Sequence, residues 1–201
     1  MDDVQGQDNS RDTPFVGPGL ANTIRECDGH VKMMSFWTFD DVFEEGGVDP
    51  ETFDGSFGLI GLGGIKKPSY YDFGLLHQLG DRRIANTAHN VLVTRSKNGG
   101  LAIAVWNIVD PGATGSTKSV RLTFRGLPPN ATVTISRVDG THGNPMPAYQ
   151  AMGSPQYPTM AQVKQLNTAS ALPPPEERHL EDNGLDLKLA PNALVLVKVQ
   201  P

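Results

Sequence analysis

The sequence offers few groups from which covalent or metal cross-links could be built. Cys27 is its only cysteine, so an intramolecular disulfide and a cluster of thiolate ligands are both excluded. No Gly-rich segment has the spacing of a phosphate-binding or dinucleotide-binding loop, and no cofactor is predicted. A metal site is also not predicted, because the histidines lack the short spacing of zinc ligands: His30, His77, His89, His142 and His179.

The chain also lacks a basic cluster and a long apolar run. Its formal net charge is −5, so a nucleic-acid partner is not expected. No apolar run approaches the ~20 residues of a membrane span, and Met1-Asp2-Asp3-Val4 is not the start of a signal peptide. We therefore expect a soluble chain without a membrane partner, cytoplasmic as written. The sequence leaves its true localisation and its oligomeric state open.

The most informative stretch is an apolar run that carboxylates follow. Residues 31–39 are apolar without clean alternation, which is typical of a parallel strand that is covered on both faces. Trp37 offers a flat face to a sugar ring, and carboxylates accept hydrogen bonds from its hydroxyls. Four acids follow where α/β barrels gather ligand-contacting side chains: Asp40, Asp41, Glu44 and Glu45. Composition alone leaves open a core role for the aromatics and a solvated loop for the acids.

Residues 37–45 resemble a known signature. They are Trp-Thr-Phe-Asp-Asp-Val-Phe-Glu-Glu, similar to Trp-Thr-Phe-Ser-Asp-Val-Phe-Glu-Glu of glycoside hydrolase family 39, the β-xylosidases and their α-L-iduronidase relatives. Asp40 in place of Ser is the only departure. Further segments resemble the family in the same order: residues 11–14, 53–59, 64–70 and 75–80. Ordered matches of this kind make a chance resemblance improbable.

The resemblance implies that residues 1–85 are the last elements of a (β/α)8 TIM barrel and that residues 86–201 form an antiparallel β-sandwich. The residue pattern agrees. Residues 15–28 have the spacing of an amphipathic helix that Gly29 ends. A second helix is predicted from Pro68 to Gly80, with Ser69 and Asp72 as a capping pair.

Beyond Gly80 the pattern predicts short strands with Gly/Pro turns. Residues 89–95 and 101–107 flank Asn98-Gly99 and form a β-hairpin. Residues 185–189 and 193–199 are predicted to pair with each other. Two more strands are expected at residues 119–124 and 132–138, while residues 139–184 are too polar for strands and contain one helix near 159–166.

The family resemblance also implies a reaction. Its members are retaining glycosidases, which need two carboxyl groups roughly 5–5.5 Å apart. The resemblance places them in an Asn-Glu-Pro and a Thr-Glu motif on other strands, and neither motif occurs here. The prediction is therefore no catalytic residue in this chain, and substrate contacts from Trp37 below the ring and from Glu44 and Glu45 to its hydroxyls. The substrate would be a xyloside or a related saccharide, and the chain alone would be inactive.

A second interpretation assigns the working part to the sandwich. In it the chain is a non-catalytic carbohydrate-binding or interaction module, for which exposed aromatic side chains on a sheet face would be needed. Trp106 and Tyr149 are the candidates, although Trp106 lies in an apolar strand and fits the core better.

Overall fold

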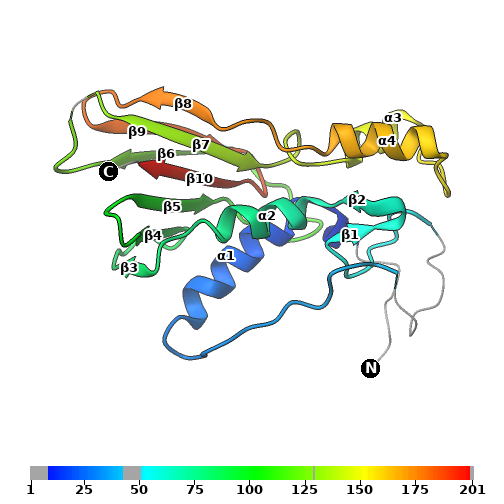
Figure 1. Cartoon of the computed structure of the whole chain (residues 1–201), viewed down its shortest axis with the longest axis horizontal. Helices are drawn as coiled ribbons and strands as arrows, with labels where there is room; N and C mark the ends of the chain where they lie inside the picture. The colour runs from blue at the N-terminus through cyan, green and yellow to red at the C-terminus, as the bar shows by residue number, and fades with distance from the viewer. Residues whose placement is uncertain (1–8, 43–50, 129, 200–201) are drawn as a thin grey trace.

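The computed structural model describes residues 9–42, 51–128 and 130–199 as a mixed α/β fold with mostly antiparallel sheets. Six strands form the larger sheet in the order β3-β4-β5-β10-β7-β8, and β6 and β9 form a second sheet that packs beside its β10–β7–β8 half (Figure 1). No closed barrel is present among these residues. The strands are β3 Arg82–Ile84, β4 Val91–Arg95, β5 Leu101–Trp106, β6 Lys118–Thr123, β7 Thr132–Val138, β8 Glu176–His179, β9 Gly184–Leu189 and β10 Leu194–Val199.

The main hydrophobic core lies between the two sheets. Alternate residues of β9 and β10 point into it, since successive side chains of a strand face opposite ways. The aliphatic residues at its centre are almost fully buried, and each contributes roughly 1.5–3 kcal/mol of transfer free energy. They include Leu185, Leu187, Leu189, Val195, Val197 and Val199.

Two helices cover the other face of the larger sheet. The helix α1 spans Val16–Cys27 and α2 spans Pro68–Leu76, as the sequence pattern predicted (Figure 1). Ala21 of α1 and Leu76 of α2 pack in one cluster with Trp106. The packing of these two helices on the sheet holds the N-terminal end of α2 in place. Residues at that end belong to the candidate functional site.

The strand predictions are confirmed for the β4–β5 hairpin and for β6, β7, β9 and β10. The predicted pairing of residues 185–189 with 193–199 is wrong. The strand β9 pairs with β6, and β10 lies between β5 and β7. The chain crosses from one sheet to the other between these strands, because their apolar sides face each other across the core instead of lying side by side.

The region 139–184 contains more structure than its polarity suggested. Its strand β8 pairs with β7 as the outer strand of the larger sheet, and all four of its residues are exposed. An edge strand with a solvated face does not need apolar residues. Two helices precede it, α3 Met146–Ala151 and α4 Met160–Ala169, and only the second was predicted.

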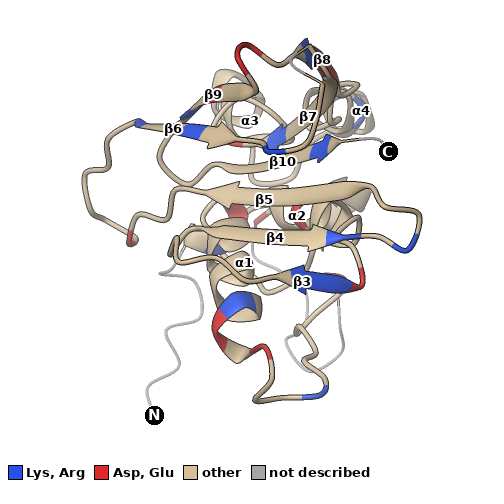
Figure 2. Cartoon of the chain, turned by 90° about the vertical axis from the view of Figure 1, so that its left-hand side faces the viewer, with Lys and Arg blue, Asp and Glu red and all other residues tan. Residues whose placement is uncertain are grey.

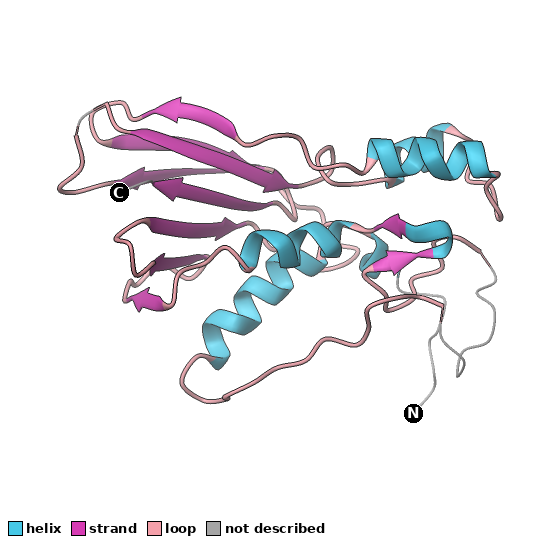
Figure 3. Cartoon of the chain, viewed as in Figure 1, coloured by secondary structure: helices cyan, strands magenta, loops and turns pink. Residues whose placement is uncertain are grey.

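The prediction of a buried strand at residues 31–39 is wrong for this structure. The segment runs as a loop from the end of α1 toward residue 42, as Figure 3 shows. Several of its apolar side chains are exposed, among them Met33 at 87% and Trp37 at 63%. A parallel strand needs neighbours for its backbone groups on both sides. Within the described residues, backbone hydrogen bonds pair this segment with a distant part of the chain only at its end, where residues 38–41 lie beside residues 57–60 and Asp40 and Ile60 form an isolated parallel bridge.

Four short elements belong to the same region of the fold. They are the 3₁₀ helix η1 at Asn9–Asp12 and a short hairpin of β1 Ile60–Gly61 and β2 Ile65–Lys66, with the 3₁₀ turn η2 Leu62–Gly64 between its strands. The predicted capping pair of the helix that follows is also wrong. Ser69 and Asp72 are both buried, and the N-cap residue Lys67 makes no side-chain capping bond.

Charged residues lie mostly on loops and outer strands, where acidic and basic positions interleave (Figure 2). The central strand β5 carries no charge. Of the helices that the structure describes, none combines the length and the apolar character that crossing a membrane would require.

Candidate functional site

The backbone around Trp37 is held from its C-terminal side. Residues 38–41 run beside residues 57–60 through a series of backbone hydrogen bonds. Thr38 N donates to the oxygen of Phe57 at 3.2 Å, and Leu59 N donates to the oxygen of Thr38 at 3.1 Å. Asp41 N donates to Ile60 O at 2.9 Å. Trp37 therefore directly precedes a backbone segment that hydrogen bonds hold in place, and most of its side chain is exposed.

The two glutamates predicted to contact the sugar, Glu44 and Glu45, lie outside the described residues. The two aspartates before them can be placed. Asp40 is half-buried, and its Oδ1 accepts a hydrogen bond from Val42 N at 2.8 Å. Asp41, in contrast, is only 2% exposed and points into the protein. The acidic run thus contains one residue whose side chain is buried, so it is not a uniform sugar-facing set.

Asp41 belongs to a buried ion network that the sequence did not reveal. Lys67 Nζ lies 2.6 Å from Asp41 Oδ2 and 2.7 Å from Asp12 Oδ1, and it donates to Ser56 O at 2.9 Å. Lys67 and Asp12 are fully buried. The remaining oxygens of the two carboxylates accept from Gly58 N and Gly55 N, at 2.5 and 2.8 Å.

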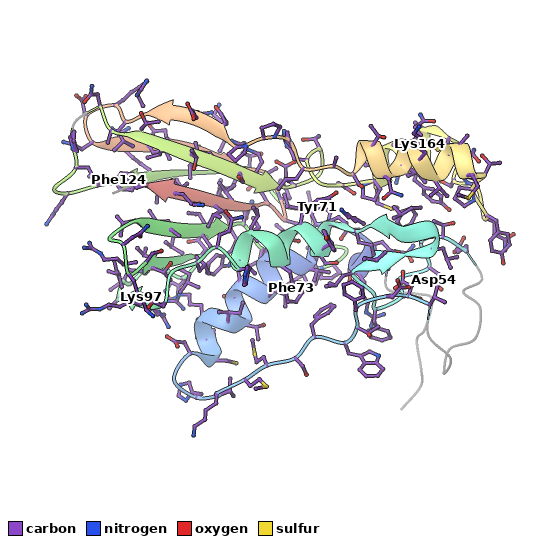
Figure 4. The ribbon with its side chains drawn as sticks, viewed as in Figure 1. Asp54, Tyr71, Phe73, Lys97, Phe124 and Lys164 are labelled. Atoms are coloured by element: carbon purple, nitrogen blue, oxygen red, sulfur yellow. The ribbon has the colours of Figure 1, made fainter. Side chains whose placement is uncertain are left out.

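Burial affects the pKa values of the two aspartates in this network more than the nearby ammonium does. It raises the pKa of Asp12 and of Asp41 above their ordinary value, although the Lys67 ammonium acts in the opposite direction. The carboxylate of Asp54 also raises the pKa of Asp41, and Figure 4 shows Asp54 at the end of the molecule that carries β1 and β2. Two carboxylates share one ammonium here, so the network depends on Lys67 for compensation.

The chain just beyond the undescribed residues is anchored separately. Thr52 is 1% exposed and its Oγ1 donates to Gln156 O at 3.0 Å. Phe53 packs edge-to-face on Tyr149 of α3, with 4.7 Å between ring centroids. Both partners come from the α3–α4 region of the chain. The acidic segment is thus flanked by buried anchors, Asp41 before it and Thr52 with Phe53 after it.

An apolar groove lies along the residues that precede Trp37. It has a volume of about 520 Å³ and lies between α1 and residues 31–36. Phe36 packs edge-to-face on Phe73 of α2 at 5.3 Å, and Figure 4 shows Phe73 on that helix. Cys27 is half-buried and lines the same groove.

The aromatic candidates of the second interpretation are buried. Trp106 is completely inaccessible in the cluster beneath the sheet, and Tyr149 is 5% exposed. Neither can offer a face to a sugar. Within the described part of the chain no group of three or more His, Cys, Asp or Glu side chains is placed to hold a metal ion.

Comparison with known proteins gives consistent likenesses. The model of Glycosyl hydrolases family 39 matches residues 4–184. A β-xylosidase of Geobacillus stearothermophilus is 32% identical over 194 residues, 94% of this chain and 38% of that protein. A second, from Caldicellulosiruptor saccharolyticus, is 29% identical and is covered to 42% of its length. The crystal structure of a monomeric β-xylosidase from Caulobacter crescentus shares the fold at a TM-score of 0.84 and 24% identity, over 98% of this chain and 43% of that one. The chain spans about two fifths of the length of these relatives.

Proposed function

Because the chain belongs to glycosyl hydrolases family 39, we propose that it is the C-terminal portion of a β-xylosidase-like glycoside hydrolase and supplies one wall of the sugar pocket. The observation that carries this proposal is the position of Trp37. Its side chain is 63% exposed at the start of a backbone segment that residues 57–60 and a buried ion network hold in place. An exposed indole on a rigid support suits the apolar face of a pyranose.

In the proposed parent enzyme, residues 1–85 complete a (β/α)8 barrel and residues 86–201 form the sandwich beside it. The exposed apolar segment at 31–39 supports this arrangement, since it would become a covered strand once neighbours pair with it. The parallel bridge between Asp40 and Ile60 supports it too. Glu44 and Glu45 would follow at the rim and bind hydroxyls of the sugar.

The reaction of such an enzyme would be hydrolysis of a glycosidic bond with retention. One carboxyl group protonates the leaving oxygen and a second attacks the anomeric carbon, at roughly 5–5.5 Å separation. Adjacent side chains such as Glu44 and Glu45 cannot lie on opposite sides of the bond by themselves. The role of this chain is therefore to bind and orient the sugar, and the two reacting glutamates belong to other strands of the barrel.

The isolated chain should not hydrolyse an aryl β-xyloside. We expect release of the aryl alcohol by the purified 201-residue chain to equal the buffer blank, because binding groups alone do not supply an acid and a nucleophile. A chromogenic assay measures this directly. The matched variants Glu44→Gln and Glu45→Gln serve as controls for traces of host enzyme. Turnover that either substitution abolishes would show that the chain carries its own catalytic carboxylate and would contradict the assignment.

A further inference from the structure

We propose that Lys67, Asp12 and Asp41 are positioning residues for Trp37, so that the ion network sets the orientation of the indole that would face the sugar. The inference rests on the proposed function for its biological meaning. Its structural content can be tested without any sugar. The three charges come from three separate segments: η1, the residues after Trp37, and the start of α2.

The first step is that the network joins these segments at one point. The ammonium of Lys67 lies within 2.7 Å of a carboxylate oxygen from each aspartate, and none of the three side chains is more than 2% exposed. Water cannot replace either partner at such burial. Loss of one charge would leave the others uncompensated. The contact between the three segments therefore depends on all three side chains.

The second step leads from Asp41 to Trp37. Asp41 Oδ1 accepts from Gly58 N, and its own N donates to Ile60 O, so both its side chain and its backbone hold residues 57–60. Thr38 completes the same ladder next to Trp37. If Asp41 moves, the ladder loses its far end, and the residue at its near end is the indole.

Residues 57–60 also lie very close to Asp41. A Cβ atom added at Gly58 would overlap the backbone nitrogen of Asp41 and its carboxylate. The two segments therefore lie closer than any other residue at 58 would allow. On the other side, Arg11 stacks over the ring of Phe57 at 3.9 Å and donates to Gly55 O at 3.0 Å, which ties the same loop to η1.

These contacts favour a positioning role over general stabilisation. Buried ion pairs contribute little net stability compared with apolar packing of the same volume, but they can specify one arrangement. The sandwich core and the two-helix layer already supply apolar burial elsewhere. What the network adds is a single geometry for the ladder that ends at Trp37.

The test is the ligand-free fluorine spectrum of the chain labelled with 5-fluorotryptophan. The chain has two tryptophans, Trp37 exposed and Trp106 fully buried, so each gives one resonance that Trp37→Phe assigns. In Asp41→Asn we expect the Trp37 resonance to shift, to split, or to increase its line width by about twofold. The Trp106 resonance should not change. As a control, Leu185→Ala weakens the sandwich core and should leave Trp37 unchanged.

A second variant decides the outcome if Asp41→Asn unfolds the chain and moves both resonances. The triple change Asp12→Asn, Asp41→Asn, Lys67→Met removes every charge together and should retain the fold, since no buried charge is left alone. Displacement of Trp37 with Trp106 retained supports the proposal. A Trp37 resonance at its wild-type position and width in the folded variants would overturn it. Because no sugar is present, failure of xyloside binding would not affect this result.

Discussion

Replacing Lys67 by methionine should lower the free energy of unfolding at neutral pH by about 3–5 kcal/mol, the usual cost of leaving buried charges without their partner. Methionine fills a similar volume but leaves the carboxylates of Asp12 and Asp41 facing each other in the interior. Urea unfolding followed by circular dichroism gives the value. Lys97→Met is the matched control, because Lys97 is 91% exposed and should cost less than about 0.5 kcal/mol.

The same variant should respond to pH in a defined direction. Burial already raises the pKa of both aspartates, and removal of the ammonium raises each further. A folded state with raised carboxyl pKa values loses stability as pH rises through them, so the deficit of Lys67→Met should shrink toward acidic pH. A deficit below about 1 kcal/mol at pH 7 would mean that the network is solvated and would contradict the account.

Asp72→Asn should make the chain more stable at neutral pH, by about 1–3 kcal/mol. The carboxyl group of Asp72 is fully buried, and neither oxygen has a hydrogen-bond partner within the described residues. It lies against Gly17 of α1, where a side chain at 17 would overlap it. Burial raises the pKa of Asp72 well above the ordinary 3.8. Between pH 3.8 and that raised pKa, the folded chain therefore keeps a proton that the unfolded chain releases.

This difference gives the gain a clear pH dependence. The favourable contribution of the protonated Asp72 is complete below about pH 3.8 and is lost as pH rises through its folded pKa. The advantage of Asp72→Asn should therefore be small near pH 4 and grow toward pH 7 in denaturant unfolding curves. Asp81→Asn, at an exposed carboxylate, should show no comparable trend. If Asp72→Asn is less stable than the parent at pH 7, the carboxylate has a partner that this structure does not describe.

Local patterns predicted elements whose signals are contained in a few residues. The Asn98-Gly99 turn between two apolar runs specified the β4–β5 hairpin, and spacing specified α1 and α2. The strand β8 was not predicted, because an exposed edge strand has no apolar alternation in its sequence. Residues 31–39 have the composition of a covered strand, but strand formation depends on neighbours that composition cannot supply.

The candidate site divides in the same way. The motif predicted a sugar contact for Trp37, which stays a prediction. The buried role of Asp41 could not be predicted, because carboxylates that bind sugar and carboxylates that pair in the interior look the same in a sequence. Lys67 and Asp12 stand within the segments that resemble the family, which was the only available signal for them. Only the three-dimensional structure shows that both side chains meet Asp41 in one ion network.

The most direct measurement of the central claim is a calorimetric titration of the chain with xylobiose. We expect weak binding that Trp37→Ala reduces by about tenfold or more, corresponding to roughly 1.4 kcal/mol. Tyr157→Ala, at another exposed aromatic of 60% accessibility, should leave the affinity unchanged. Binding that survives Trp37→Ala at full strength would place the sugar elsewhere on the molecule and contradict the proposed wall.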